Sequence, residues 1–143
     1  MKILITFFYI FLSIISVQAK ECTHSLYEKA DNDAVRFENW KQVYDYDKKY
    51  NGCIGSGTSE ILSESIVRIL ADKWEQLPDL KNLIKKNKKF EEFVFSSIDS
   101  TVSGDDLLKI NYLAKKQCPK NSRKLCSKIG RKALRAYKEM DEF

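Results

Sequence analysis

The sequence has few of the residues that interrupt helices. It contains two prolines and five glycines in 143 residues, and Pro78 and Pro119 both fall at the ends of apolar patterns with helical spacing. No alternating strand pattern extends beyond a few residues, and there is no internal repeat, low-complexity tract or domain linker. These absences exclude a fold built on a β-sheet and a repeat array. They predict an all-α fold, a small bundle of five to seven helices.

Metal-binding and catalytic residues are equally scarce. The single histidine, His24, lies beside Cys22, but the chain has no second histidine and no CxxC spacing, which argues against zinc. A Ser–His or Cys–His catalytic pair would have to use this same histidine. The segment 45–47 begins like a calcium loop, but Tyr50 stands where that loop needs glycine. We therefore expect no metal, no cofactor and no catalytic residue.

Two weaker signals for chemistry remain. The glycines of segment 52–57 precede a helix and could cradle an anion, but the segment lacks the preceding strand and the Lys-Ser/Thr ending of a P-loop. A connector is the favoured interpretation. The carboxylate pairs Glu60/Glu64 and Glu91/Glu92 could in principle hydrolyse glycans. The helical pattern places both pairs on polar faces, so an envelope hydrolase ranks below the other functions considered.

The N-terminus has the layout of a secretory signal peptide. Lys2 supplies one positive charge, residues 3–15 form an uncharged, largely apolar run, and Val17 and Ala19 are small residues at the −3 and −1 positions of a cleavage site. The alternative is an uncleaved membrane anchor, but the run is shorter than the ~20 residues that span a bilayer. We predict a signal peptide over 1–19 and one helical domain over 20–143, in a periplasmic or secreted protein.

The four cysteines all lie in the predicted mature chain. An even number of cysteines in a small exported domain favours disulfides, although free buried thiols are the alternative. Cys118 and Cys126 flank a short loop and are expected to pair, which leaves Cys22 with Cys53. A straight helix would hold that second pair ~45 Å apart. The chain must therefore fold back between them, and we expect the break at 31–33.

Helical periodicity divides the rest of the chain. We expect helices over 22–30, 34–50, about 59–77, 78–86, 90–98, 103–117 and 122–140. Trp74, Leu70, Phe93 and Ile110 should be buried together. Lys73 falls within the apolar arc of the 59–77 helix, where a lysine usually extends its ammonium group to solvent. A buried ion pair or a ligand contact is the alternative.

The last predicted helix is strongly two-sided. Its apolar face is formed by Leu125, Ile129, Ala133, Ala136, Tyr137 and Met140. A stripe of cations that no acid interrupts lies nearly opposite, formed by Lys124, Lys128, Arg131, Arg135 and Lys138. A solvated surface without function is one interpretation. The other is docking to a partner with an acidic surface. If the stripe does not bind, segment 52–59 and the tyrosines Tyr44, Tyr46 and Tyr50 are the next candidates.

Several short motifs carry a resemblance. They are Ala71-Asp72-Lys73-Trp74, Leu77-Pro78-x-Leu80-x-x-Leu83, Phe90-x-x-Phe93-Val94, Ile98-Asp99-x-Thr101, Asp106-Leu107-x-x-Ile110, and Cys118-Pro119 with Leu125-Cys126. Over residues 61–129 the chain resembles a group of small exported helical proteins of proteobacteria. The resemblance implies an exported bacterial helical domain with a Cys118–Cys126 bridge, and it supplies no catalytic residues.

A looser likeness, of class rather than motif, is to periplasmic immunity proteins, which block toxins from neighbouring bacteria. We therefore expect a non-catalytic exported binding protein, of the immunity type. A carrier of a small apolar ligand is the alternative, because many aromatic residues in a small bundle could line a cavity. The predicted formal charge after cleavage, +4, permits contact with an anionic surface without demanding it. The expected partner is a protein with an acidic surface, not a nucleic acid.

Overall fold

The computed structural model describes residues 22–140, so the predicted signal peptide lies outside the described residues. Within them the chain forms seven α-helices, one short 3₁₀ helix and no strand. The prediction of a small all-α bundle is therefore confirmed. The helices are α1 (His24–Ala34), α2 (Trp40–Tyr50), α3 (Ser56–Asp72), η1 (Trp74–Gln76), α4 (Leu77–Lys86), α5 (Lys88–Ser96), α6 (Gly104–Lys116) and α7 (Arg123–Met140).

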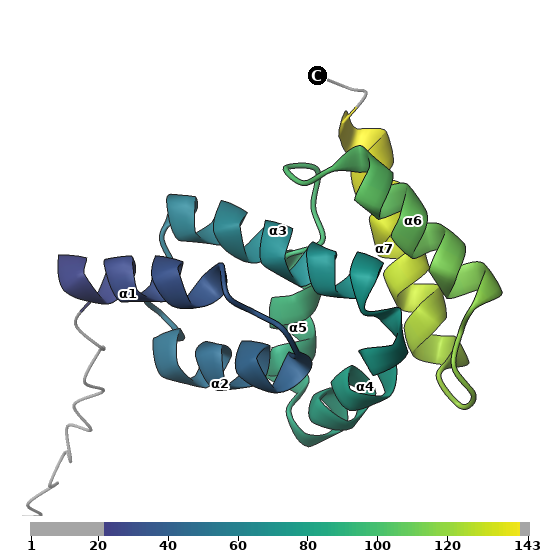
Figure 1. Ribbon diagram of the computed structural model, residues 1–143, viewed down its shortest axis with the longest axis horizontal. Coiled ribbons are helices and arrows are strands. Elements are labelled where there is room, and N and C mark those ends of the chain that lie inside the picture. The colour runs from purple at the N-terminus through teal and green to yellow at the C-terminus, as the bar shows by residue number, and fades with distance from the viewer. Residues whose placement is uncertain (1–21, 141–143) are drawn as a thin grey trace, which may run out of the picture.

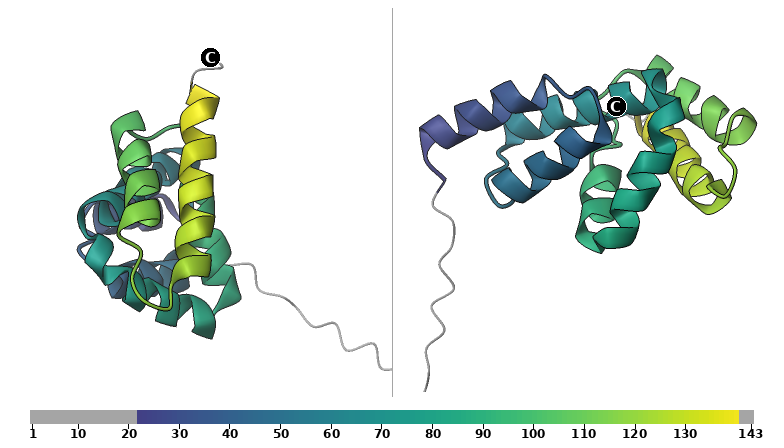
Figure 2. Two further views of the ribbon diagram at one scale, coloured as in Figure 1. Left: turned by 90° about the vertical axis from the view of Figure 1, so that its right-hand side faces the viewer. Right: turned by 60° about the horizontal axis from the view of Figure 1, so that its bottom comes forward.

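Helix α3 lies at the centre of the arrangement. It contacts α1 along one side and α6 on another, while α2 contacts α1, α4 and α5. Figures 1 and 2 show α6 and α7 as an antiparallel pair at one end of the molecule. Nine residues of α3 are buried, including Ser63 and Ser65. This number is larger than a single apolar helix face would give, so α3 is covered on more than one side. We call residues 22–103 the N-terminal region and residues 104–140 the C-terminal hairpin.

The first break in the chain lies later than predicted. Helix α1 continues through 31–33 to Ala34, and tertiary contacts hold one of the acidic residues that suggested a break. Asp33 accepts hydrogen bonds from the Tyr50 hydroxyl at 2.6 Å and the Lys49 ammonium at 3.0 Å, and both keep its pKa below the ordinary value. Helix α2 starts at Trp40, after the N-cap Asn39, whose side chain accepts a hydrogen bond from the Gln42 N–H.

The prediction of one helix over 59–77 is also wrong. Helix α3 begins at Ser56 and ends at Asp72, and the 3₁₀ helix η1 leads into α4, with Pro78 in the first turn of α4. Lys73 is thus the C-cap of α3 and not part of an apolar helix face. Its ammonium reaches the carboxylate of Glu38, which is largely exposed. Lys73 therefore extends its ammonium group towards the surface, where it forms an ion pair with Glu38.

The core runs through the whole described chain as one cluster. Leu70, Trp74 and Ile110 are buried as predicted, whereas Phe93 is only partly buried and packs against the edge of the cluster. Aromatic side chains pack on one another within it. The ring centroids of Phe37 and Tyr46 are 5.2 Å apart. This continuous core joins the N-terminal region to the hairpin without a domain boundary.

Both predicted disulfides are present. Cys22 bonds to Cys53, with their Cα atoms 5.4 Å apart, and Cys118 bonds to Cys126, with their Cα atoms 6.0 Å apart. The first bridge ties the segment before α1 to the loop after α2. In that loop Gly52 has a φ of 83°, a left-handed conformation that favours glycine, as expected for the residue just beyond the C-cap of a helix.

The two helices of the hairpin approach closely at Gly130. A Cβ atom built there would lie 2.9 Å from the Cβ of Ala114, so a larger side chain would force the helices apart. The Asn111 amide donates a hydrogen bond of 2.7 Å to the Gly130 carbonyl and fixes the register. Small residues on both helices therefore set the spacing of the pair.

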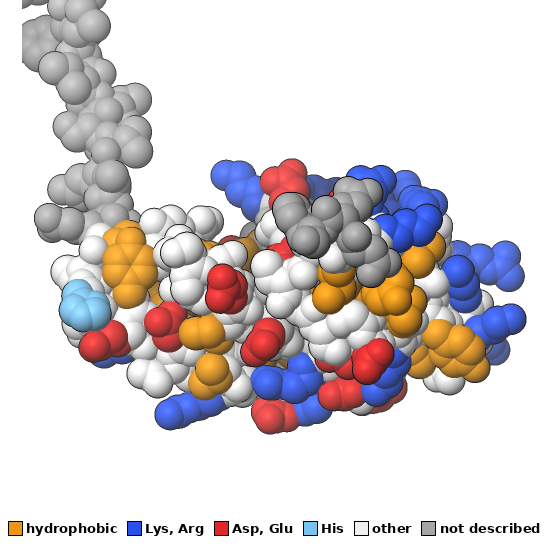
Figure 3. Space-filling view, turned by 90° about the horizontal axis from the view of Figure 1, so that it is seen from above, with side chains coloured by type: hydrophobic (Ala, Val, Ile, Leu, Met, Phe, Trp, Pro, Cys, Tyr) orange, Lys and Arg blue, Asp and Glu red, His pale blue; other side chains and the backbone are white. Residues whose placement is uncertain are grey.

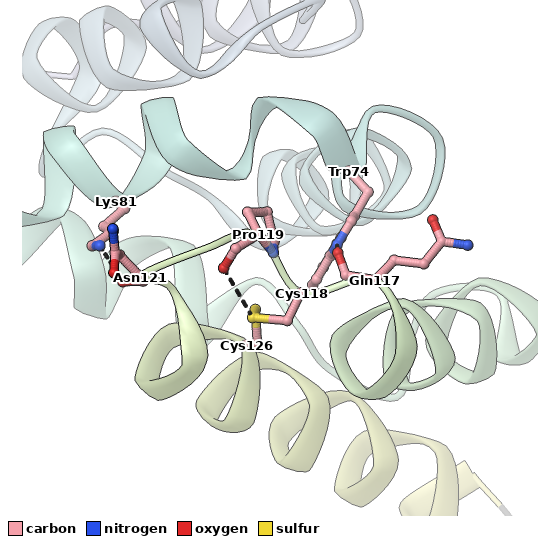
Figure 4. Close-up of a disulfide and its surroundings, with 7 residues drawn as sticks. All are labelled: Trp74, Lys81, Gln117, Cys118, Pro119, Asn121 and Cys126. Atoms are coloured by element: carbon pink, nitrogen blue, oxygen red, sulfur yellow. Dashed lines mark hydrogen bonds between the residues drawn. A yellow bond between two sulfur atoms is a disulfide. The ribbon is translucent and has the colours of Figure 1, made fainter.

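The loop 117–121 is fastened to the N-terminal region at both ends. The Trp74 indole N–H donates to the Gln117 carbonyl at 2.9 Å, and the Lys81 ammonium donates to the carbonyl of Asn121. Figure 4 shows the loop passing the Cys118–Cys126 disulfide between these two contacts. The loop and its disulfide therefore hold the start of α7 in a fixed position beside α4.

Candidate interaction surface

Charge is distributed unevenly between the two parts of the chain. The C-terminal hairpin carries eleven Lys and Arg against three Asp and Glu, a formal charge of +8. The N-terminal region carries twelve against fourteen, a formal charge of −2. On the face seen in Figure 3, Lys and Arg side chains gather at the end of the molecule where α6 and α7 lie. The hairpin is thus the positive end of the protein.

The predicted stripe on α7 lies where the sequence places it. Lys124, Arg131, Arg135 and Lys138 are exposed, while Leu125, Ile129, Ala133 and Ala136 are buried on the opposite face. The side chains at 137 and 140, predicted for the apolar face, are only partly covered or exposed. The stripe is therefore available to solvent along most of its length.

Lys128 differs from the other members of the stripe. Its ammonium lies 2.6 Å from Glu91 of α5 and 5.8 Å from the ring centroid of Phe95. Lys128 is the largest cause of the lowered pKa of Glu91, and Lys88, 3.2 Å away, lowers it further. Lys128 therefore fastens α7 to α5, and four residues of the stripe remain for contact with another molecule.

The structure adds cations that the helical pattern did not connect to the stripe. An open hollow of about 730 Å³ at the corner between α6 and α7 is lined by five cations and no carboxylate: Lys115, Lys116, Lys120, Arg123 and Lys124. All five fall within ten residues of the sequence, and no acidic residue separates them. This local concentration of cations is the sequence signal that could have indicated the hollow. The basic surface is therefore wider than α7 alone.

Two apolar side chains interrupt the basic surface on α6. Leu108 is 41% exposed and Tyr112 is 58% exposed, and their spacing places them on one face of the helix. Lys116 follows Tyr112 by one further turn. Exposed tyrosines surrounded by polar residues are typical anchors of protein interfaces, because the ring buries a large area and has few torsions to fix. From the sequence, Ile110 of this helix was assigned to the core, and this exposed pair was not singled out.

The alternative binding site proposed from the sequence is wrong in its main part. Tyr46 and Tyr50 are 3% and 1% exposed, so they belong to the core and do not offer anchors to a partner. Burial and the nearby Asp31 raise the pKa of Tyr46. Much of the segment after Gly55 is the first turn of α3 instead of a free loop. Tyr44 alone of the three is partly exposed, and its ring packs edge-on against Phe90.

The residues considered for metal binding or hydrolysis lie apart. His24 is highly exposed, and its imidazole is 3.8 Å from Glu28, its neighbour one turn along α1. Among residues 22–140 no group of three His, Cys, Asp or Glu side chains is close enough to hold a metal ion. Glu60, Glu64 and Glu92 are exposed on their helices, and only Glu91 is partly covered. No helix within that range is long and apolar enough to cross a membrane.

Comparisons with known proteins give no relative to set beside this surface: no protein-family model, no curated protein and no solved structure matches the chain.

Proposed function

We propose that the protein is an exported, non-catalytic binding protein that recognises a protein with an acidic surface through its C-terminal hairpin. We further propose that it is an inhibitor of the immunity type, which neutralises an antagonistic toxin. The observation that carries the proposal is the concentration of uncompensated cations on one end of the fold, with an exposed tyrosine among them.

Two further features support the proposal. The four cysteines of the described chain are all joined in disulfides, and structural disulfides are typical of proteins that work in oxidising compartments. Exposed cations attract an acidic partner over about a Debye length and speed its approach, whereas a buried aromatic anchor slows its release. The hairpin offers both kinds of group on one surface.

The first experiment compares what the wild-type protein and a charge-reversed variant bind. Wild type and Arg131→Glu/Arg135→Glu are each immobilised and exposed to envelope extracts of the native host and its competitors. We expect an acidic protein to be retained by wild type at low salt and lost with the variant, while circular dichroism shows the same helix content for both. Retention of the same proteins by both would contradict the proposal.

Kinetic measurements with the purified partner then test whether the cations set the association rate and Tyr112 the dissociation rate. The charge-reversed variant should associate about tenfold more slowly at low salt and differ little at high salt, because screening weakens exposed charges. Tyr112→Ala should chiefly raise the dissociation rate. Inhibition of a toxic activity of that partner by the wild-type protein would support the immunity assignment, and a partner whose activity is unaffected would overturn it.

A further inference from the structure

A second basic feature lies between the hairpin and the N-terminal region. A cleft of about 180 Å³ opens where α4 and α5 face the start of α7. Its walls carry five lysines and a single carboxylate, that of Glu91, a formal excess of four positive charges; the lysines are Lys81, Lys85, Lys88, Lys124 and Lys128. The volume is below the ~300–1,000 Å³ of sites for drug-sized ligands, so it suits one small charged group.

The lysines of the cleft are only partly compensated. Lys128 and Lys88 share the carboxylate of Glu91, and the ammonium of Lys81 donates to the carbonyl of Asn121. Lys85 and Lys124 form no ion pair or hydrogen bond with any other described residue. Two cations without an ion-pair partner among the described residues thus line the cleft, and an anion bound there would compensate them.

The first turn of α7 supplies further donors. The N–H groups of residues 123–125 precede the first helical hydrogen bond, in which the Cys126 N–H donates to the Ser122 carbonyl. The turn holds two cations and no acid, although the N-terminus of a helix is its positive end and favours negative charge. An oxyanion placed there would receive backbone hydrogen bonds and relieve this repulsion.

Ser122 is the observation that points to a ligand independently of the helix end. It is 2% exposed and lines the cleft. A serine just before a helix usually accepts a hydrogen bond from an N–H of the first turn. The Ser122 hydroxyl makes no hydrogen bond to another residue of the described chain. The hydroxyl therefore lines the cleft without a protein partner, and it is available to donate to a ligand there.

We propose that this cleft binds a phosphate-type oxyanion, held by Lys85, Lys124, the Ser122 hydroxyl and the backbone N–H groups at the start of α7. The anion is either free phosphate or the phosphomonoester of a small molecule. The cleft shares Lys124 with the stripe, but its other lysines on α4 and α5 do not belong to the surface proposed for the protein partner, so the anion site is tested without that partner.

The test follows the amide resonances of the full chain by NMR during titration with inorganic phosphate, with glycerol 3-phosphate, and with chloride at matched ionic strength. We expect saturable shifts of residues 122–125 with at least one phosphate compound and none with chloride. Comparison of the two phosphate compounds distinguishes free phosphate from a phosphomonoester. Shifts that fail to saturate, or that spread evenly over all lysines, would overturn the proposal.

Matched variants distinguish a specific phosphate site from the general attraction of phosphate to a basic protein. Lys85→Gln/Lys124→Gln removes one cation from α4 and one from α7 within the cleft, and should weaken phosphate binding about tenfold, because two charged donors are lost. Lys86→Gln/Lys132→Gln removes the same charge from the same helices outside the cleft and should weaken it less than about twofold. Ser122→Ala should weaken binding severalfold without lowering the helix content. Equal losses in both double variants would show that no site exists.

Discussion

The N-terminal region and the C-terminal hairpin share one core but differ in how they neutralise their charges. In the N-terminal region, basic and acidic residues are nearly balanced, and ion pairs such as Lys49 with Asp33 and Lys73 with Glu38 close within it. The ion pairs of the hairpin, among the described residues, both use a carboxylate of the other region: Lys109 with Asp72, and Lys128 with Glu91.

This difference separates the charges that hold the fold together from those that face outward. Nearly balanced charge creates little long-range potential, whereas a cluster of one sign creates a potential that attracts the opposite sign. The hairpin gains its stability from packing at Gly130 and from a disulfide, so most of its cations are not needed for folding. The experiments below test two expectations: the two regions unfold together, and the cations of the hairpin are not needed for folding.

The largest expected effect tests whether the regions unfold together. Leu70 is 1% exposed on α3, the helix that contacts both α1 and α6. Leu70→Ala should lower the free energy of unfolding by ~2–5 kcal/mol, because it leaves a cavity in the shared core. Native-state hydrogen exchange should show α2 and α7 losing protection by the same amount.

Leu108→Ala provides the matched control for that prediction. The same side chain is removed, but Leu108 is 41% exposed, so the loss should stay within about 0.5 kcal/mol. A loss below about 1 kcal/mol for Leu70→Ala, or loss of protection confined to one region, would mean that the core is not shared.

The next largest effect concerns how much each disulfide stabilises the fold. Cys22–Cys53 spans 31 residues and Cys118–Cys126 spans 8, so the chain-entropy model gives stabilisation of about 3.7 and about 2.5 kcal/mol respectively. Removing each by a pair of Cys→Ala substitutions and measuring urea unfolding checks the order. We expect the first pair to be the more destabilised. The reverse order would show that the short bridge holds the hairpin on the N-terminal region and does more than shorten a loop.

The smallest effect concerns the carboxylate that the N-terminal region supplies to the hairpin. Lys128 and then Lys88 lower the pKa of Glu91, so this residue stabilises the fold above the unfolded pKa, and that contribution is lost as the pH falls through the lower, folded pKa. Glu91→Gln should cost about 1 kcal/mol at pH 7 and flatten the dependence of stability on pH below about 4.5.

The neighbouring Glu92 gives the control, because it is exposed on the same helix. Glu92→Gln should leave both the stability at pH 7 and its pH dependence unchanged within about 0.5 kcal/mol. Thermal unfolding of the two variants from pH 3 to pH 7 makes the comparison, and identical profiles would contradict a specific role for Glu91.

Much of the fold could be predicted from local signals in the sequence. The cysteine spacing gave both disulfides, Pro78 marked the start of α4, and Ser103 capped α6, where its hydroxyl accepts a hydrogen bond from the Asp106 N–H. These features depend on residues close together in the chain. The start of α2 was available in the same way: the Asn39 side chain accepts from the Gln42 N–H, and the Gln42 side chain accepts from the N–H of Glu38, just before the cap.

The remaining errors depend on contacts between distant residues. Nothing near Asp33 indicates that Tyr50 and Lys49 will bind its carboxylate and allow α1 to continue. Likewise, the sequence around Lys73 does not show that α3 stops before it. For the candidate site, periodicity predicted the stripe on α7 but not the corner cations or Tyr112. Those depend on how α6 packs against α7 and on which face of α6 stays uncovered.

The separation of charge along the molecule also makes the protein an electric dipole. One end has a formal charge of +8 and the rest of the described chain −2. In the field of a negatively charged body this dipole experiences a torque that turns the hairpin towards the source before contact. Collisions would then occur with α6 and α7 leading, so a larger share of encounters would begin in a productive orientation than random tumbling allows. The gain should vanish as salt shortens the range of the field.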